Sequence, residues 1–486
     1  MSVAEIVTAI LRGAHCAALA SLFGTLVFTA VVVRRPPATT WAQALRIRLT
    51  RLAQVSLVLA FALGVAWFVA EAAAIAGTEG IGETLAALPP VALDTQFGRL
   101  VLVRFALLLT LLPLGLVLRT PSGPAVAVPS AREGVAAARE PACQGKAAAA
   151  PVRRAGRDRA ALAAAIILAG GALGLQSAIG HAGAIGGVVG DRLLIAEALH
   201  VWAAGAWLGG LAPLLICLAT LPDDVAALAV RRFFPLGVAT VTVIAGTSLI
   251  QAIDLVGSVP ALVGTAYGQV ALLKLALFLS LLGLAALNRF AFSARPGAAL
   301  RRSIAGESAL AVVVVLAAGF LAHLTPGAHE QPVWPFQWRM NPKTPGDLFV
   351  AAFPTSFFDS PTGFAAADIV RGEAVYRADC AVCHGAAGHG DGPAAGTLPH
   401  HPPDLTGRGL LEFSDGDLFW LAGHAVGTPE EDRWALVDYL RAHDRGEFMR
   451  SSGRGLVPVR IPQASLLQFL AAKRRAAGQQ LVEQHT

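Results

Sequence analysis

Long apolar segments separated by loops of varied length dominate the first two thirds of the chain. Eight segments are long enough to cross a bilayer, since a transmembrane helix needs about 20 mostly apolar residues. They cover residues 14–33, 52–76, 100–118, 160–179, 193–221, 233–253, 268–287 and 304–324. Glu5 and the length of the first run predict a retained span rather than a cleaved signal peptide. The pattern predicts an all-α polytopic membrane domain of eight transmembrane helices over residues 1–325.

The loops between these segments differ in basic residues. Arg and Lys concentrate in residues 34–51, 119–159, 231–232 and 289–302, whereas loops 77–98 and 255–267 contain neither. Cytoplasmic loops carry the excess of Lys and Arg in membrane proteins. The sequence therefore predicts a cytoplasmic linker at 119–159 and a multi-pass protein of the bacterial inner (plasma) membrane. Both termini are predicted on the periplasmic side.

Two pairs of segments resemble each other across the halves of this domain. HCAALASLFGTL from His15 parallels HVWAAGAWLGGL from His200. In the third and seventh segments, FGRLVLVRFALLL parallels YGQVALLKLALFL, which sets Arg104 opposite Lys274. Chance similarity between Ala- and Leu-rich helices is the alternative. Two matched pairs with polar residues in register favour two parallel four-helix repeats.

Composition and charge agree with a membrane protein. Of the 486 residues, 55% are hydrophobic and 14% are charged, whereas a soluble domain carries about a quarter charged residues. The net charge of +6 comes from basic clusters beside apolar runs. It therefore indicates membrane topology, and we expect no nucleic acid partner.

Ionisable residues recur at one predicted depth, about 20 residues or roughly 30 Å from the basic edge. They are His15, Glu71, His181, His200, Asp254 and His323. Glu197 lies one turn before His200, while Arg104 and Lys274 lie deeper and can extend toward this layer. Ordinary polar residues at wet helix ends are the alternative interpretation.

Four histidines at one level nevertheless favour a metal site, because imidazole binds both copper and haem iron. We predict that His15, His181, His200 and His323 bind copper, or alternatively b-type haem between the helices. The predicted supporting residues are Glu71, Arg104, Glu197, Asp254 and Lys274.

Three stretches carry a family resemblance. GHAG (180–183), EALHVWAAGAWLGGLAPLL (197–215) and AYGQVALLKLALFLSLLGLAALNR (266–289) resemble the copper resistance D family of inner-membrane proteins. The resemblance implies eight spans and copper handling, usually taken to be import from the periplasm with a periplasmic copper-binding partner.

The sequence changes character after His323. Residues 326–364, rich in Pro, Trp and Phe, predict a periplasmic linker, and residues 365–450 resemble a small helical class I cytochrome c. Cys380 and Cys383 would bind haem c covalently, and His384 would ligate its iron. A zinc or thiol redox site is the alternative, but the adjoining histidine and the lack of a second cysteine pair argue against zinc. Residues 451–486 form a basic tail, either disordered or at the membrane surface.

The opposite face of the haem lacks its usual ligand. Cytochromes of this class supply a Met before the last helix, yet the stretch GHAVGTPEEDRW contains none. We predict His424 or Met449 as second axial ligand, with an open sixth position as the alternative. His389, His400 and His401 line the earlier loop.

Together these features predict a copper transport or homeostasis protein with a tethered haem for electron transfer, rather than a catalyst. The alternative is a membrane electron-transfer protein that passes electrons between b-type haem and the c-type haem. An oxidoreductase, such as a membrane oxidase of the urate-oxidising kind fused to a cytochrome, fits the spans but not the motifs. Expected partners are the lipid bilayer, copper ion, a periplasmic copper-binding protein and a redox partner.

Overall fold

The computed structural model describes most of the chain. It covers residues 2–33, 39–119, 149–180, 183, 185–292, 297–340, 349–406, 410, 413–443, 447–452, 455–460, 464–465 and 468. The predicted site residue His181 lies outside these residues, as do most of the predicted cytoplasmic linker and most of the predicted tail.

The chain divides into two compact units. The membrane unit comprises Met1–Asp254 and Val270–Leu324, and the second unit comprises Leu255–Gln269 and Thr325–Thr486. The second unit therefore includes a loop between two membrane helices as well as the C-terminal part of the chain.

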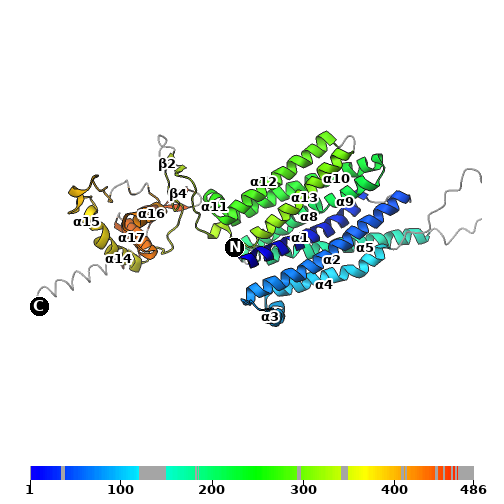
Figure 1. The fold of residues 1–486 in the computed structure, drawn as a ribbon, viewed down its shortest axis with the longest axis horizontal. Helices are drawn as coiled ribbons and strands as arrows, with labels where there is room; N and C mark the ends of the chain where they lie inside the picture. The colour runs from blue at the N-terminus through cyan, green and yellow to red at the C-terminus, as the bar shows by residue number, and fades with distance from the viewer. Residues whose placement is uncertain are drawn as a thin grey trace, which may run out of the picture. The chain divides into compact units, whose positions relative to one another are not determined.

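Eight helical segments of the described residues are long and apolar enough to cross a membrane, which confirms the predicted fold class. Their main helices run side by side in Figure 1. They are α1 (Val3–Phe28), α2 (Thr40–Ala76), α4 (Gln96–Arg119), α5 (Ala149–Gly174), α8 (Gly187–Leu208), α10 (Asp223–Gln251), α12 (Ala266–Leu287) and α13 (Ala298–Leu321). Short helices extend several of them: α6 (Gln176–Ile179), α9 (Leu211–Thr220) and the π-helical turns Thr29–Val33, Ala252–Val256 and Asn288–Phe292.

The fifth predicted span, 193–221, is broken in the structure. It divides into α8 and α9 at Gly209 and Gly210. A Cβ atom on Gly209 would lie 1.9 Å from the carbonyl oxygen of Ala20 on α1. The break therefore lies where α8 approaches α1 too closely for any side chain.

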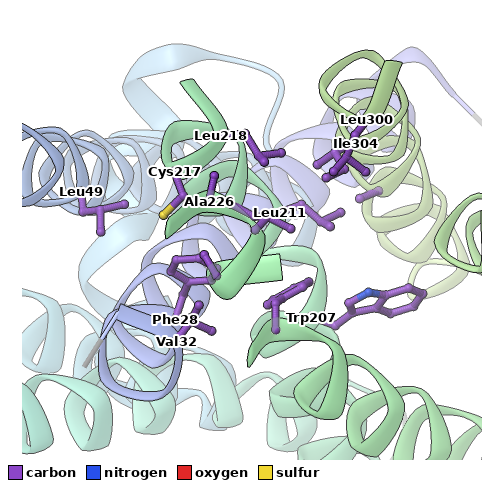
Figure 2. Close-up of a cluster of buried hydrophobic side chains, with 14 of the residues drawn as sticks. Phe28, Val32, Leu49, Trp207, Leu211, Cys217, Leu218, Ala226, Leu300 and Ile304 are labelled. Atoms are coloured by element: carbon purple, nitrogen blue, oxygen red, sulfur yellow. The ribbon is translucent and has the colours of Figure 1, made fainter. Parts of the chain in front are cut away.

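An apolar core joins helices from both halves of the membrane unit. Figure 2 shows Phe28, Leu49, Trp207 and Leu300 converging on it with their neighbours. Trp207 is only 3% exposed, and Cys217 of α9 is completely buried. Burial of such side chains holds α1, α2, α9 and α13 together.

Two loops for which the sequence predicted no helix contain helices in the structure. One is α3 (Ile81–Asp94), which packs against α2 and α4, and the other is α11 (Val259–Gly264). In α11 the Ser258 hydroxyl accepts the Ala261 amide at 3.1 Å, an N-cap that starts the helix.

The second unit contains a small helical domain. Its helices are α14 (Ala366–Val375), the π-turn Tyr376–Cys380, α15 (Ala381–His384), α16 (Asp415–Val426) and α17 (Glu430–His443), with short 3-10 turns at Gly327–His329 and Ala395–Thr397. At the crossing of α14 and α17, a Cβ on Gly372 would lie 1.9 Å from the Ala435 carbonyl oxygen. Phe419 and Trp434 stack in the core with ring centroids 4.3 Å apart.

Two antiparallel hairpins accompany this domain. Strands β1 (Trp338–Met340) and β2 (Phe349–Ala351) pair Arg339 with Val350, and β3 (Glu447–Ser452) pairs with β4 (Gly455–Arg460). Arg339 is buried and donates to Asp417 of α16 at 2.8 Å, which fastens the first hairpin to the helices.

Candidate functional site

Cys380, Cys383 and His384 lie on one short turn of the second unit. Cys380 ends the π-helical turn and the other two belong to α15. Gly385 follows with a φ of +77°, and a Cβ there would lie 2.0 Å from a carboxylate oxygen of Asp391. Only glycine fits at this position, because the chain turns back sharply toward the following loop.

The donor set suits a covalently attached haem. Both cysteines are free thiols, and His384 Nδ1 donates to the Pro403 carbonyl at 3.0 Å, which leaves Nε2 available to iron. Burial, together with Asp379 and Cys383, raises the pKa of the Cys380 thiol to about 11. Apolar residues around Ile369 and Leu418 form a dry shell against which Cys380 packs.

The two candidates for the second axial ligand lie on different elements. His424 is exposed near the end of α16, where its Nδ1 bonds the Trp420 carbonyl at 3.0 Å and its ring stacks on Trp420 at 4.0 Å. Met449 lies in β3, with Pro458 as its register partner. Neither assignment is tested by these contacts, and the second axial ligand stays a prediction.

In the membrane unit, the structure brings His15 and Arg104 together. Both are completely buried, and Arg104 Nη1 donates to His15 Nε2 at 3.3 Å. His15 Nδ1 donates to the Ala60 carbonyl at 2.7 Å, so both ring nitrogens are engaged. Arg104 also donates to the Ala172 carbonyl at 3.0 Å and to Gln176 at 3.2 Å. A ligand role for His15, which stays a prediction, would require that one of these bonds be replaced.

Glu71 and His323 form a second pair. Glu71 Oε2 accepts from Trp67 Nε1 at 3.0 Å and lies 4.0 Å from His323 Nε2. Trp67 is only 1% exposed and stacks on His15 with centroids 5.8 Å apart. Two of the predicted residues therefore meet here, beside a tryptophan that the sequence analysis did not select.

Arg12 is another residue that the sequence analysis missed. It is 5% exposed, lies over Trp67 at 5.6 Å, and leaves its Nη2 without a hydrogen-bond partner. A Cβ on Gly180 would lie 3.4 Å from Glu197 and 3.7 Å from Arg12 Nη2, so the two charges flank one glycine. The register that aligns His15 with His200 also aligns Arg12 with Glu197, and this signal could have revealed it.

The remaining predicted residues occupy separate environments. His200 Nδ1 lies 3.1 Å from the Thr247 hydroxyl, and the charge of Lys274 acts on both His200 and Glu197. Asp254 pairs with Arg192 at 2.5 Å. Within the described part of the chain, no three His, Cys, Asp or Glu side chains are grouped to hold a metal ion.

Three family models match successive parts of the chain. The copper resistance protein D-like N-terminal domain covers residues 3–150, copper resistance protein D covers 227–321, and cytochrome c covers 369–444. The second of these spans α10 to α13 of the membrane unit. No solved structure matches the chain.

One relative similar to part of this chain is also named as a copper protein. The copper transport protein CutJ of Bacillus subtilis (strain 168) is 31% identical over 147 residues, which are 29% of this chain. Those residues are 27% of the relative, so the match spans about a quarter of its length. The chain thus joins a copper resistance protein D membrane part to a cytochrome c domain.

Proposed function

We propose that this protein transports copper across the bacterial inner membrane and that its c-type haem exchanges an electron with copper on the periplasmic side. One observation carries the proposal: the chain matched by the two copper resistance models also holds Cys380, Cys383 and His384 in a haem-binding turn. A transporter alone would not need the second unit, and a soluble electron carrier would not need eight spans.

The orientation follows from the basic loops. Because Arg and Lys concentrate on one side of the spans, the rule for cytoplasmic loops assigns the haem domain to the periplasm. Copper arriving there as copper(II) gains one electron to become copper(I). The electron comes from a redox partner, and the haem supplies one-electron chemistry between the two. A periplasmic copper-binding protein is the expected donor of the ion.

The residues of the second unit support this role. His384 is held by the Pro403 carbonyl, and the Tyr376 hydroxyl fixes the turn by donating to the Gly385 carbonyl at 2.8 Å. Such bonds fix the ring that ligates the iron and exclude competing orientations. The apolar shell limits access of water, which helps set the reduction potential.

The double variant Cys380→Ala/Cys383→Ala tests the coupling. We expect it to reach the membrane but to lose covalent haem, and cells that produce it should take up less copper with an altered copper(I) fraction. The measurement is copper uptake together with a copper(I)-specific probe.

Val382→Ala is the matched control, since Val382 lies between the two cysteines and its side chain is 47% exposed. It should retain haem and full uptake. Unchanged uptake and copper redox state in the cysteine variant would refute the coupling.

A further inference from the structure

Glu71 near the end of α2 and His323 just after α13 face each other across a short gap. Their Oε2 and Nε2 atoms lie 4.0 Å apart, and the side chains are only 22% and 16% exposed. His323 Nε2 is buried without a hydrogen-bond partner. An imidazole lone pair that is buried and unmatched is costly unless a ligand satisfies it.

Both side chains are held by groups behind them. Trp67 Nε1 donates to Glu71 Oε2 at 3.0 Å, and Trp67 itself is locked by His15 on its face and Phe97 on its edge at 5.4 Å. The backbone of Thr8 also acts on His323, while its Nε2 has no hydrogen-bond partner. A protein partner beside the ring helps to orient a histidine that ligates a metal.

The separation suits one small metal ion. Imidazole nitrogen and carboxylate oxygen bind transition metals at about 2 Å each, so donors 4.0 Å apart fit opposite positions around one ion. Tetragonal sites of nitrogen and oxygen donors are typical of copper(II). A two-donor site leaves other positions open, as an ion in transit requires.

The surrounding charges also admit a cation. The charges of Glu71, Arg12 and Glu5 act on His323, so two carboxylates oppose one guanidinium. Arg12 Nη1 donates a hydrogen bond to the Ala322 carbonyl at 3.2 Å, and its guanidinium lies over the Trp67 ring. His15, by contrast, has both nitrogens bonded and Arg104 directly beside it.

We propose that Glu71 Oε2 and His323 Nε2 bind copper(II) as a two-donor entry site of the membrane unit. The identity of the metal rests on the proposed function, whereas the pair itself rests on the geometry. Trp67 is a positioning residue, and His15 is excluded from the site.

The test is copper(II) binding to the purified full-length protein in detergent, followed by electron paramagnetic resonance and by competition with glycine. Glu71→Gln and His323→Gln should each remove one nitrogen- and oxygen-coordinated copper(II), or weaken it at least about tenfold. Matched controls are Glu79→Gln and His329→Gln, which change exposed residues of the same types. Unchanged stoichiometry and affinity in both site variants would overturn the proposal.

If Glu71→Gln or His323→Gln disrupts folding, as judged by gel filtration, Trp67→Phe serves as the test instead. It keeps both ligands but removes the donor to Glu71, so we expect about tenfold weaker binding. Unchanged affinity in a folded Trp67→Phe protein overturns the proposal. Copper uptake distinguishes this inference from the proposed function. If variants that lack the bound ion still transport copper, only the site is contradicted. If the ion binds but the protein transports no copper, only the proposed function is contradicted.

Discussion

Asp438 of α17 is a buried carboxyl that accepts hydrogen bonds from two hydroxyl groups. It has no exposed surface, and it accepts from Thr362 at 2.5 Å and Ser360 at 3.4 Å. Burial raises the pKa of Asp438 from 3.8 to about 7. Because the folded pKa exceeds the unfolded one, its favourable contribution is complete below about pH 4 and is lost as the pH rises through 7.

We therefore expect the second unit to be less stable at pH 8 than at pH 5, by about 3 kcal/mol from this group, since part of the effect is already lost between pH 4 and pH 5. Thermal loss of the native haem spectrum in the full-length protein measures this difference. Asp438→Asn should flatten the pH dependence. A slope of equal size in the variant would assign the effect to other groups.

Site residues could be predicted from the sequence where they lie close together along the chain. Cys380, Cys383 and His384 stand together in the sequence, and the structure keeps them on one turn. Arg12, Trp67 and Gln176 were missed because their roles depend on helices far away in sequence, such as the bond from Arg104 to Gln176. An arginine near the start of a span is otherwise an ordinary interfacial residue.

At the scale of elements, the contact of α1 with α8 allows a sharp test. Gly24 faces the Gly205 carbonyl, where a Cβ would lie 2.4 Å from the oxygen, and Gly209 faces Ala20 in the reciprocal contact. Gly209→Ala should destabilise the membrane unit by about 1–3 kcal/mol or more, because the backbones must separate. Thermal unfolding in detergent checks this.

Gly283→Ala on α12 is the control, since a Cβ there meets nothing within 4 Å. It should be neutral or slightly stabilising, because Ala favours helix over Gly. Equal effects of the two substitutions would contradict the close contact.

The elements themselves were largely foreseen, since length and hydropathy determine a span. The break between α8 and α9 was not, because residues 193–221 are apolar enough to be assigned to one span. Gly209, Gly210 and Pro213 lie at the break, but the close approach of α1 to Gly209 is visible only in the structure. Likewise, α3 and the hairpin β3–β4 follow from packing and pairing that no local pattern specifies.

At the scale of the whole molecule, the proposed function predicts which cofactors the purified protein holds. We expect a c-type haem band that survives denaturation, because the thioethers are covalent, and no b-type band. His15 in particular offers no free nitrogen to a second haem. An extractable b-type band that disappears in His200→Ala would favour the electron-transfer alternative.

The architecture of spans followed by a cytochrome domain was predictable from the sequence and agrees with the family models. The two-repeat organisation stays a prediction, as does the membrane orientation. The sequence could not show which histidine has a ring nitrogen free to bind copper. Depth along a span places His15 and His323 at one level but does not show which nitrogens already have hydrogen-bond partners.

Arg12 and Glu197 have a consequence for how the two halves of the membrane unit recognise each other. The alignment that predicts two repeats sets them at matching positions. One side chain is a guanidinium and the other a carboxyl, and both lie within 4 Å of where a Cβ on Gly180 would be. If the chain were divided within residues 120–148, two copies of the first fragment would oppose guanidiniums, and two copies of the second would oppose carboxylates. Only the mixed pair is neutral at this contact. If the predicted repeats are correct, the unlike groups favour pairing of the two different halves over pairing of two like ones.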